Sequence, residues 1–326
     1  MRNVLICAAA MLAVTGCETG IDVPVSIPAQ YQGAAQLRNI AVIDFQGRDG
    51  GAFAGALEAE LSNAAFNGAS YFNVLNRQTL QTRSGVGGSS DAAVAAAIDY
   101  GAQLGVDAVY FGEVSGFDVE QSSERVEKSK CVEYDGIFDC EKREKYTTTC
   151  YTLAAFYTVV PKVADVRSGQ VVYSDTVTGN SDAYFCDEDT SKVSGDQLLA
   201  EARSDTLSQI RNAVAPRNAR AKVDLAEAAS LPDRSDQSEF DGAVAFAKEG
   251  RLDRACGTWE VLLDRYPTTF ELLYNTAVCA EVSGDFSRAF DIYSQIDAGL
   301  VSPNTKVSDA LSRVQSQLRA QRLTPN

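Results

Sequence analysis

The fold of this chain is decided by residues 39–67, NIAVIDFQGRDGGAFAGALEAELSNAAFN. The stretch opens with a largely apolar run, Asn39–Phe45, which is typical of a buried β-strand, and a glycine-rich turn follows it. A helical pattern then covers 52–67, and its apolar residues recur on one face: Phe53, Leu57, Leu61 and Ala65. A buried strand followed by an amphipathic helix begins a β-α-β unit, so an α/β domain is expected.

The alternation of strands and helices continues downstream. YFNVLNRQTLQ (71–81) predicts a short strand and the start of a helix, and VDAVYFGEVSGFDVE (106–120) predicts a longer strand. Helices are expected over Ala92–Leu104 and Gly195–Val214. Runs with hairpin signals lie between the last strand and the last helix. The pattern predicts an α/β (α+β) domain over 38–215 with a mixed sheet and β-hairpins.

The sequence offers no constellation typical of an enzyme. It contains no histidine, which removes the commonest general base and the commonest metal ligand. The turn GRDGGAFAG (47–55) does not match GxGxxG or GxxxxGK[ST], so helix entry explains its glycines better than a nucleotide site. Three acidic residues lie at expected strand ends, where such residues are ordinary: Asp44, Asp107 and Glu113. We therefore expect no catalytic residue, no cofactor and no metal.

The first residues resemble the signal of bacterial lipoproteins. Residues 4–14 form an apolar core too short to span a bilayer, and small residues lead into Cys17. The resemblance implies removal of 1–16, lipidation of Cys17 and a lipidated linker over 17–37. Glu18 stands where an aspartate would mark inner-membrane retention in enteric bacteria, so the resemblance implies an outer-membrane lipoprotein that faces the periplasm. A plain signal peptide with a chance cysteine is the alternative.

Six cysteines remain beyond the signal and the lipidation site, and an oxidising compartment favours their pairing: Cys131, Cys140, Cys150, Cys186, Cys256 and Cys279. Asp135-Gly136 predicts a two-residue hairpin loop, and that register places Cys131 opposite Cys140 at a spacing that suits a disulfide. The alternative for the first four cysteines is a zinc site. Their spacing disfavours it, because there is no CxxC and no histidine.

The other two pairs depend on a second hairpin and on two helices. A three-residue loop at 167–169 would centre the hairpin on its middle residue and place Cys150 opposite Cys186. Cys256 and Cys279 lie on consecutive expected helices, at equal distances from the turn between them. An antiparallel helix pair would bring these two to one level, so a third disulfide and two buried free thiols are equally open.

Residues near the C-terminus repeat with a period of 34. The matching pairs are Gly250 and Gly284, Ala243 and Ala277, Ala255 and Ala289, and Trp259 and Tyr293. The period and the order of small and aromatic residues resemble tetratricopeptide repeats, in which paired helices stack. The resemblance implies a small all-α repeat domain over 238–326, behind a linker at 216–237. The run 307–321 is amphipathic, and we expect it to form a helix that caps the stack.

Four motifs of the first domain follow the order of the curli-assembly lipoprotein (CsgG-like) family: IAVIDFQG, FNVLNRQTLQ, GVDAVYFGEVSGF and VADVRSGQVVYSDTVTG. Residues 38–214 therefore resemble that family, whose α/β fold is shared with the penicillin-binding-protein activator lipoproteins. The strand-end arginine of the family corresponds to Arg77 beside Asn76, and we expect a structural brace or a subunit contact there. The best-known members form a ring that opens an outer-membrane channel, and each subunit contributes two hairpins.

The two regions that correspond to the channel hairpins lack the apolar rows of lipid-facing strands. The first, 122–150, contains the charged run EKREK at 141–145. The second, 177–192, is short and acidic. We expect both to be soluble hairpins that disulfides pin in place.

Charge and motifs together indicate a protein that works through contacts. The chain carries 44 acidic and 29 basic residues, a net charge of −15, which does not suit nucleic-acid binding. We expect a non-enzymatic outer-membrane lipoprotein that acts as an assembly and interaction module in the export or attachment of surface structures. Its partners would be the outer membrane, an envelope or secreted protein, and copies of itself. The alternatives are an oligomeric curli-type secretion channel and an activator of a peptidoglycan synthase.

Overall fold

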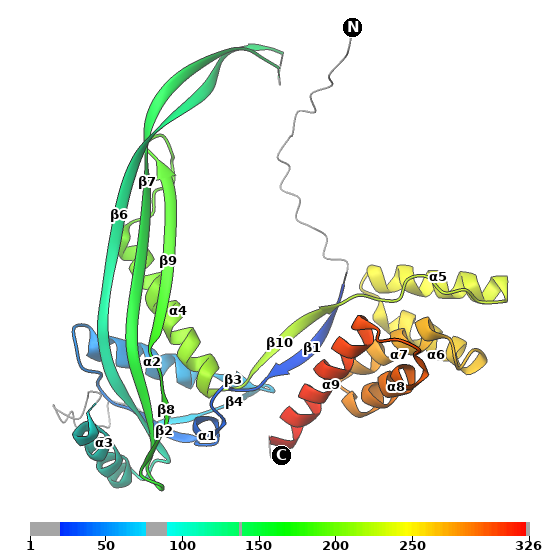
Figure 1. Cartoon of the computed structure of the whole chain (residues 1–326), viewed down its shortest axis with the longest axis horizontal. Coiled ribbons are helices and arrows are strands. Elements are labelled where there is room, and N and C mark those ends of the chain that lie inside the picture. Colours follow the sequence, from blue (N-terminus) through cyan, green and yellow to red (C-terminus); the bar gives the residue numbers. More distant parts are fainter. Residues whose placement is uncertain (1–19, 76–89, 137–138, 324–326) are drawn as a thin grey trace. The chain divides into compact units, whose positions relative to one another are not determined.

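The computed structural model describes residues 20–75, 90–136 and 139–323, which form two compact units (Figure 1). The sheet unit comprises Pro28–Arg217, and the helical unit combines the segment up to Ile27 with everything from Asn218 onward. The described chain therefore starts in the helical unit, builds the sheet unit and returns. Within the described residues, no helix is both long and apolar enough to cross a membrane.

A mixed sheet of six strands forms the centre of the sheet unit, in the order β5-β2-β6-β7-β8, and β9 pairs with residues 150–159 of β7. The strands are β2 (Asn39–Val42), β5 (Asn73–Leu75), β6 (Ala108–Asp135), β7 (Asp139–Asp165), β8 (Gln170–Ser174) and β9 (Val177–Cys186). β2 runs parallel to β5 and β6, whereas β6, β8 and β9 each pair antiparallel with β7. The predicted α/β class with a mixed sheet is confirmed, and a run of helices follows it.

Helices cover both faces of this sheet, and residues 40–43 alternate between them. Ile40 and Val42 belong to the core under α2 and α4, whereas Ala41 and Ile43 belong to the core under α3. This alternation follows from the two-residue period of a strand. The helices of the unit are α1 (Gln32–Ala35), α2 (Gly50–Ser62), α3 (Asp91–Leu104) and α4 (Gly195–Val214).

α2 is shorter than predicted, because it ends at Ser62 instead of continuing to Asn67. A small hairpin follows it, formed by β3 (Ala65–Phe66) and β4 (Ala69–Ser70). Its turn needs positive φ, and Asn67 adopts a φ of 51° there. Ala65 was expected on the buried helix face and is exposed in β3, whereas the other three apolar residues of that face are buried. Turn chemistry overrides the helical period at this point.

α4 has its predicted range and lies very close to β9. Ser194 begins the helix with a capping box, which satisfies backbone donors of the first turn. A Cβ on Gly179 of β9 would lie 2.0 Å from the backbone oxygen of Ala202. The N–H of Gly179 also donates to Thr206 Oγ1 over 3.0 Å. Only glycine permits this approach of helix and strand.

The described part of the helical unit contains β1 (Ile21–Ile27), β10 (Arg217–Val223), α5 (Arg234–Lys248), α6 (Leu252–Arg265), α7 (Phe270–Val282), α8 (Phe286–Gly299) and α9 (Thr305–Leu323). Positions 34 residues apart take equivalent places. Gly250 and Gly284 follow α5 and α7 with φ of 77° and 80°, a backbone region that favours glycine. The alanines and aromatic residues of the repeat are buried between the helices.

The expectation of linkers at 17–37 and 216–237 is wrong. The first segment contains β1 and α1, and the second contains β10 and the start of α5. β1 and β10 pair with each other, and Ile21, Val23 and Val223 are buried in the core of the helical unit. Strands whose only strand partner is distant in the sequence leave little local signal, so these segments resemble linkers in composition.

Candidate interaction site

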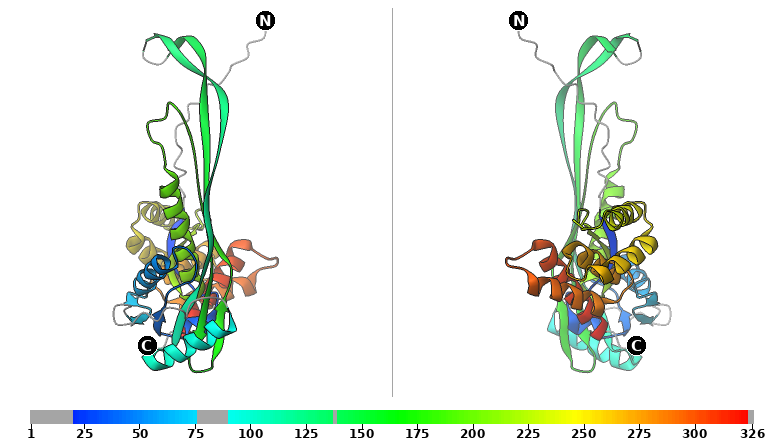
Figure 2. Two further views of the ribbon diagram at one scale, coloured as in Figure 1. Left: turned by 90° about the vertical axis from the view of Figure 1, so that its left-hand side faces the viewer. Right: turned by 90° about the vertical axis from the view of Figure 1, so that its right-hand side faces the viewer.

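The most distinctive feature of the sheet unit is the length of the β6–β7 hairpin. β9 ends at Cys186, which pairs with Cys150, and the hairpin continues beyond that point as a two-stranded ribbon (Figure 2). We call this ribbon the arm, formed by Arg125–Asp135 and Asp139–Thr149. At about 3.4 Å per residue the arm is roughly 35 Å long. Most of its side chains are exposed on both faces.

A disulfide joins β7 to β9 at the base of the arm, between the two cysteines that the prediction paired. Cys150 and Cys186 lie opposite each other on β7 and β9 and are bonded. The loop before β8 spans 166–169, one residue more than predicted, and a register shift between Val163 and Ala164 compensates for it. The longer loop and the register shift cancel, so the predicted pairing of β7 with β9 is correct.

A second disulfide, Cys131–Cys140, lies near the tip of the arm. The bond matches the predicted pair, but the predicted register is wrong. Cys140 lies opposite Tyr134 and Cys131 lies opposite Arg143, with irregularities in β6 between them. The strands end at Asp135 and begin again at Asp139, so the turn is wider than a two-residue loop. Ile137 and Phe138, which entered the predicted register, lie outside the described residues.

The third disulfide, Cys256–Cys279, joins α6 and α7 and decides between the two alternatives for these cysteines. All six paired cysteines are therefore disulfide-bonded, and none of them offers a thiolate to zinc. Among the described residues, no group of three or more histidine, cysteine or acidic side chains could hold a metal ion.

The expectation that region 177–192 forms a hairpin of its own is wrong. Residues 177–186 form the single strand β9 along β7, and the acidic residues after Cys186 belong to the connection into α4. Because β9 pairs with β7 along its whole length, it does not form a second projecting hairpin. The sheet unit thus presents one long hairpin within the described residues.

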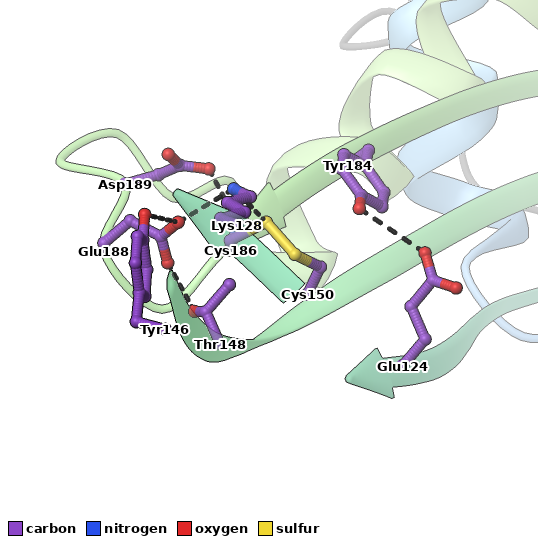
Figure 3. The surroundings of a disulfide bond; sticks show 9 residues. All are labelled: Glu124, Lys128, Tyr146, Thr148, Cys150, Tyr184, Cys186, Glu188 and Asp189. Carbon is purple, nitrogen blue, oxygen red and sulfur yellow. Dashed lines mark hydrogen bonds and ion pairs between the residues drawn. A yellow bond between two sulfur atoms is a disulfide. The ribbon is translucent and has the colours of Figure 1, made fainter. Parts of the chain in front are cut away.

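The connection after β9 is fastened to the arm through Glu188 (Figure 3). Lys128 Nζ donates to Glu188 Oε1 over 2.8 Å, and the hydroxyl of Tyr146 donates to the same oxygen over 3.3 Å. Thr148 Oγ1 donates to Glu188 Oε2. Lys128 Nζ also lies 3.0 Å from Cys186 Sγ. We call Lys128, Tyr146, Thr148, Glu188 and the Cys150–Cys186 bond the latch.

The latch is held by charge as well as by hydrogen bonds. The hydrogen bonds from Lys128 and Thr148 lower the pKa of Glu188 to about 2. The hydrogen bond to Glu188 raises the pKa of Lys128 above its ordinary value. Both groups therefore stay charged through the neutral range, and the base of the arm remains fastened there.

The tip of the arm differs from its shaft in chemistry. Val132 and Tyr134 are 41% and 62% exposed, close to the Cys131–Cys140 bond. The shaft is largely charged, and one of its ion pairs joins Lys145 Nζ to Glu127 Oε1 over 2.7 Å. Exposed apolar side chains at the end of a polar ribbon are typical of a contact surface.

The glycine-rich turn after β2 serves the packing of the sheet unit. Asp49 precedes α2 with a φ of 71°, and its Oδ2 accepts hydrogen bonds from Tyr157 OH over 2.9 Å and Arg203 over 3.0 Å. A Cβ on Gly50 would lie 2.0 Å from the backbone oxygen of Phe45. The turn thus braces α2 against β7 and α4, a role that the sequence pattern did not reveal.

Of the other residues named from the sequence, one has a bracing role and three are not described. Asp107 accepts hydrogen bonds from the backbone N–H and the side-chain amide of Asn39, which ties β6 to β2. Cys17, Asn76 and Arg77 lie outside the described residues. Sequence reasoning missed the Lys128–Glu188 pair, because its members are distant in sequence and are charged residues among many.

No protein-family model matches this chain, and no similar sequence is found among curated proteins.

Proposed function

We propose that this protein is a non-enzymatic outer-membrane lipoprotein that acts as an assembly and interaction module in the export or attachment of surface structures. The resemblance to the CsgG-like family and the lipoprotein signal before Cys17 suggest the location and the process. The observation that carries the proposal is the arm, which projects beyond β9 with apolar side chains at its tip.

The arm is stabilised far beyond what a free ribbon provides. An isolated two-stranded hairpin is marginal in water, because it lacks a hydrophobic face to bury. Here a disulfide at each end and the ion pair of Glu188 with Lys128 hold it. The core of the sheet unit does not include arm residues. A rigid element that adds nothing to the core supports a role in contacting another molecule.

Site-specific photo-crosslinking in a bacterial envelope tests the role of the arm. A photoreactive residue replaces Tyr134 at the tip, and in a matched strain it replaces Glu127 on the shaft. We expect discrete crosslinked products from the tip position and far less from the shaft. Equal yields from both positions, or none from the tip, would refute a docking role.

Native mass in detergent separates the interaction module from the secretion channel. The lipidated full chain is extracted gently, and intact-mass analysis verifies the acylation of Cys17 against a Cys17→Ser control. A monomer or small oligomer is expected of an assembly module. A discrete ring of many subunits would assign the channel function instead, and a Cys17 without lipid would overturn the proposed location.

A further inference from the structure

The side of β6 that faces away from β7 has no strand partner over much of its length (Figure 1). β2 pairs with the start of β6, and the turn after β2 extends this contact to Val114, whose N–H donates to the carbonyl of Gln46 over 2.8 Å. Beyond Val114, β7 is the only strand that pairs with β6 among the described residues. We call residues 117–124 of β6 the outer edge, because they border the sheet at this point.

Alternate residues of the outer edge turn their backbone hydrogen-bonding groups away from the sheet. The N–H of Asp187 donates to the carbonyl of Thr149 over 3.0 Å, so Thr149 bonds towards β9 and the next residue, Cys150, bonds towards β6. Cys150 lies opposite Glu124, so Glu124 bonds towards β7. The pairing with β7 is regular along the outer edge, so its odd-numbered residues all point their N–H and C=O groups outward.

The hydrogen bond of one outward group agrees with this direction. The N–H of Val119 donates to Oδ1 of Asp118 over 2.8 Å. The outward groups of Gln121 and Ser123 have no strand to pair with in the described part of the sheet unit. Natural sheets rarely leave a long edge in this state, because unpaired N–H and C=O groups accept an additional strand. The outer edge therefore has the backbone chemistry of a strand-addition site.

The face of the sheet away from α4 is acidic along the outer edge. Asp118, Glu120 and Glu124 are exposed, and none of them forms an ion pair with another described residue. Asp182 of β9 lies in the same row as Glu120, with Ala154 of β7 between them. Residues 117–124 and their partners at 150–157 contain no lysine or arginine. An added strand with basic residues at alternate positions would match these carboxylates, because side chains on one face of a strand recur at every second residue.

The opposite face of the outer edge offers apolar contacts. Phe117 stacks on Tyr157 with ring centroids 5.2 Å apart, and Phe117 and Val119 are only partly buried against the core of the sheet unit. A Cβ on Gly195, at the start of α4, would lie 3.2 Å from Val119, so α4 lies against this face. Apolar residues at the intervening positions of an added strand would extend this core. The outer edge thus fits a segment that alternates basic and apolar residues.

Charge disfavours a second copy of the chain at this edge. Two outer edges placed side by side would bring Asp118, Glu120 and Glu124 of one copy against the same carboxylates of the other. Like charges directly opposite each other destabilise a sheet. β9 carries Asp182 on the same face, so its pairing with the outer edge of another copy meets the same repulsion. The cations that complement this face therefore come from a different protein.

We propose that the outer edge is a binding site for an extended segment of a partner protein in which lysine or arginine alternates with apolar residues. The segment adds to β6 as a further strand. Its backbone pairs with the outward groups of Gln121 and Ser123, and its cations face Glu120 and the neighbouring carboxylates. The proposal extends the interaction role proposed above but does not use the tip of the arm. A failure of this site and a failure of the tip to crosslink are therefore separate results.

Fluorescence anisotropy with labelled eight-residue peptides, the length of the outer edge, tests the site in the full chain carrying Cys17→Ser. The probe alternates lysine with valine, and the control peptide has the same composition with lysines and valines in separate blocks. We expect saturable binding of the alternating peptide and binding about tenfold weaker for the control.

The charge requirement is tested by three amide substitutions together, Asp118→Asn, Glu120→Gln and Glu124→Gln. They keep the side-chain shapes and the oxygen that accepts from Val119. We expect them to weaken binding of the alternating peptide about tenfold. A control chain loses three exposed carboxylates of the helical unit and should bind as the unchanged chain does: Glu239→Gln, Asp264→Asn and Asp291→Asn.

The backbone requirement separates strand addition from simple charge attraction. Gln121→Pro removes an outward N–H at an edge where proline is tolerated, and it should weaken binding about tenfold, whereas Gln121→Ala should not. If Gln121→Pro does not fold, two N-methylated peptides take its place, methylated on every lysine nitrogen or on every valine nitrogen. Alternate N–H groups face opposite sides of a strand, so one of these peptides should lose binding and the other should keep it.

Four results would overturn the proposal. They are no binding of the alternating peptide, equal binding of the block peptide, binding that the three amide substitutions leave unchanged, and binding that neither Gln121→Pro nor either methylation pattern reduces. A dimer of the unchanged chain that Gln121→Pro dissociates would assign the outer edge to a second copy and would also overturn it.

Discussion

Removing Arg313 should destabilise the helical unit more than any exposed charge change in it. Glu281 on α7 has no exposed surface, and its carboxylate accepts from Arg313 Nε over 2.7 Å and from Arg313 Nη2 over 2.6 Å. The hydroxyl of Tyr293 donates to Glu281 Oε1 over 2.7 Å. The network therefore connects α7, α8 and α9 through one buried carboxylate.

The expected loss of stability follows from the buried carboxylate that the substitution leaves without its charged partner. Arg313→Met keeps most of the side-chain volume but removes both charged donors, so Glu281 retains only the bond from Tyr293. An uncompensated buried charge costs about 3–5 kcal/mol. The matched control is Arg288→Met, because Arg288 pairs with Glu260 over 2.8 Å at the surface, with about half of each side chain exposed. That change should cost ~0–1 kcal/mol.

The single tryptophan makes the measurement specific to this unit. Trp259 is the only tryptophan of the chain and is fully buried in the helical core. Its fluorescence during denaturant unfolding therefore reports this unit, while far-UV circular dichroism reports the whole chain. A loss below about 1 kcal/mol for Arg313→Met, equal to that of Arg288→Met, would refute the argument. Adding Glu281→Leu to Arg313→Met should recover most of the loss, because a buried pair replaced by apolar residues is often neutral.

Three further changes test the sheet unit. Replacing Cys150 and Cys186 by serine opens a loop of separation 36, so we expect a loss of ~4 kcal/mol and faster hydrogen exchange in the arm; unchanged exchange would contradict this role. Glu188→Gln removes a carboxylate whose pKa is lowered from 4.5 to about 2, so the stability difference from wild type should be full above pH 4.5 and vanish as pH falls towards 2. Unfolding midpoints across that range measure it, and a pH-independent difference would contradict the latch. Gly179→Ala forces a Cβ to 2.0 Å from a backbone oxygen of α4 and should lower the unfolding midpoint, whereas a neutral effect would show that α4 can shift.

The order of elements in the sheet unit was predictable because its signals are local. Apolar runs and helical periods marked β2, α3 and α4, and the ends of α4 agreed with the prediction. The Cys150–Cys186 pair was predictable from the turn at 167–169 only because the register shift near Val163 offset the longer loop. The same kind of argument placed Cys131 and Cys140 in the wrong register, since β6 is irregular there and no compensation occurs.

The features that matter most for the candidate sites were not predictable, because they join distant and polar residues. The arm is a continuous part of β6 and β7, yet its shaft is too polar to suggest a strand of such length. Glu188 lies in the connection after β9, where the sequence has several acidic residues and nothing distinguishes this one. Only the fold brings Lys128 close to it. Periodicity detects burial, and these contacts depend instead on charge and shape.

The course of the chain makes the helical unit depend on segments at both ends of the sheet unit. The side-chain amide of Gln317 on α9 accepts from the N–H of Ser26 in β1 and donates to its carbonyl. The amide of Asn275 on α7 does the same for Ala226, after β10. The helical unit is therefore completed only when both ends of the sheet unit return to it. A fragment beginning at residue 238 would lack Val23 and Val223, which are buried in the helical core, and would leave both amides without their backbone partners. The sheet unit is thus an insertion between two strands of the helical unit. If Cys17 carries the lipid, three residues separate it from Ile21, so the anchor holds the helical unit through β1 and not the sheet unit through a flexible linker.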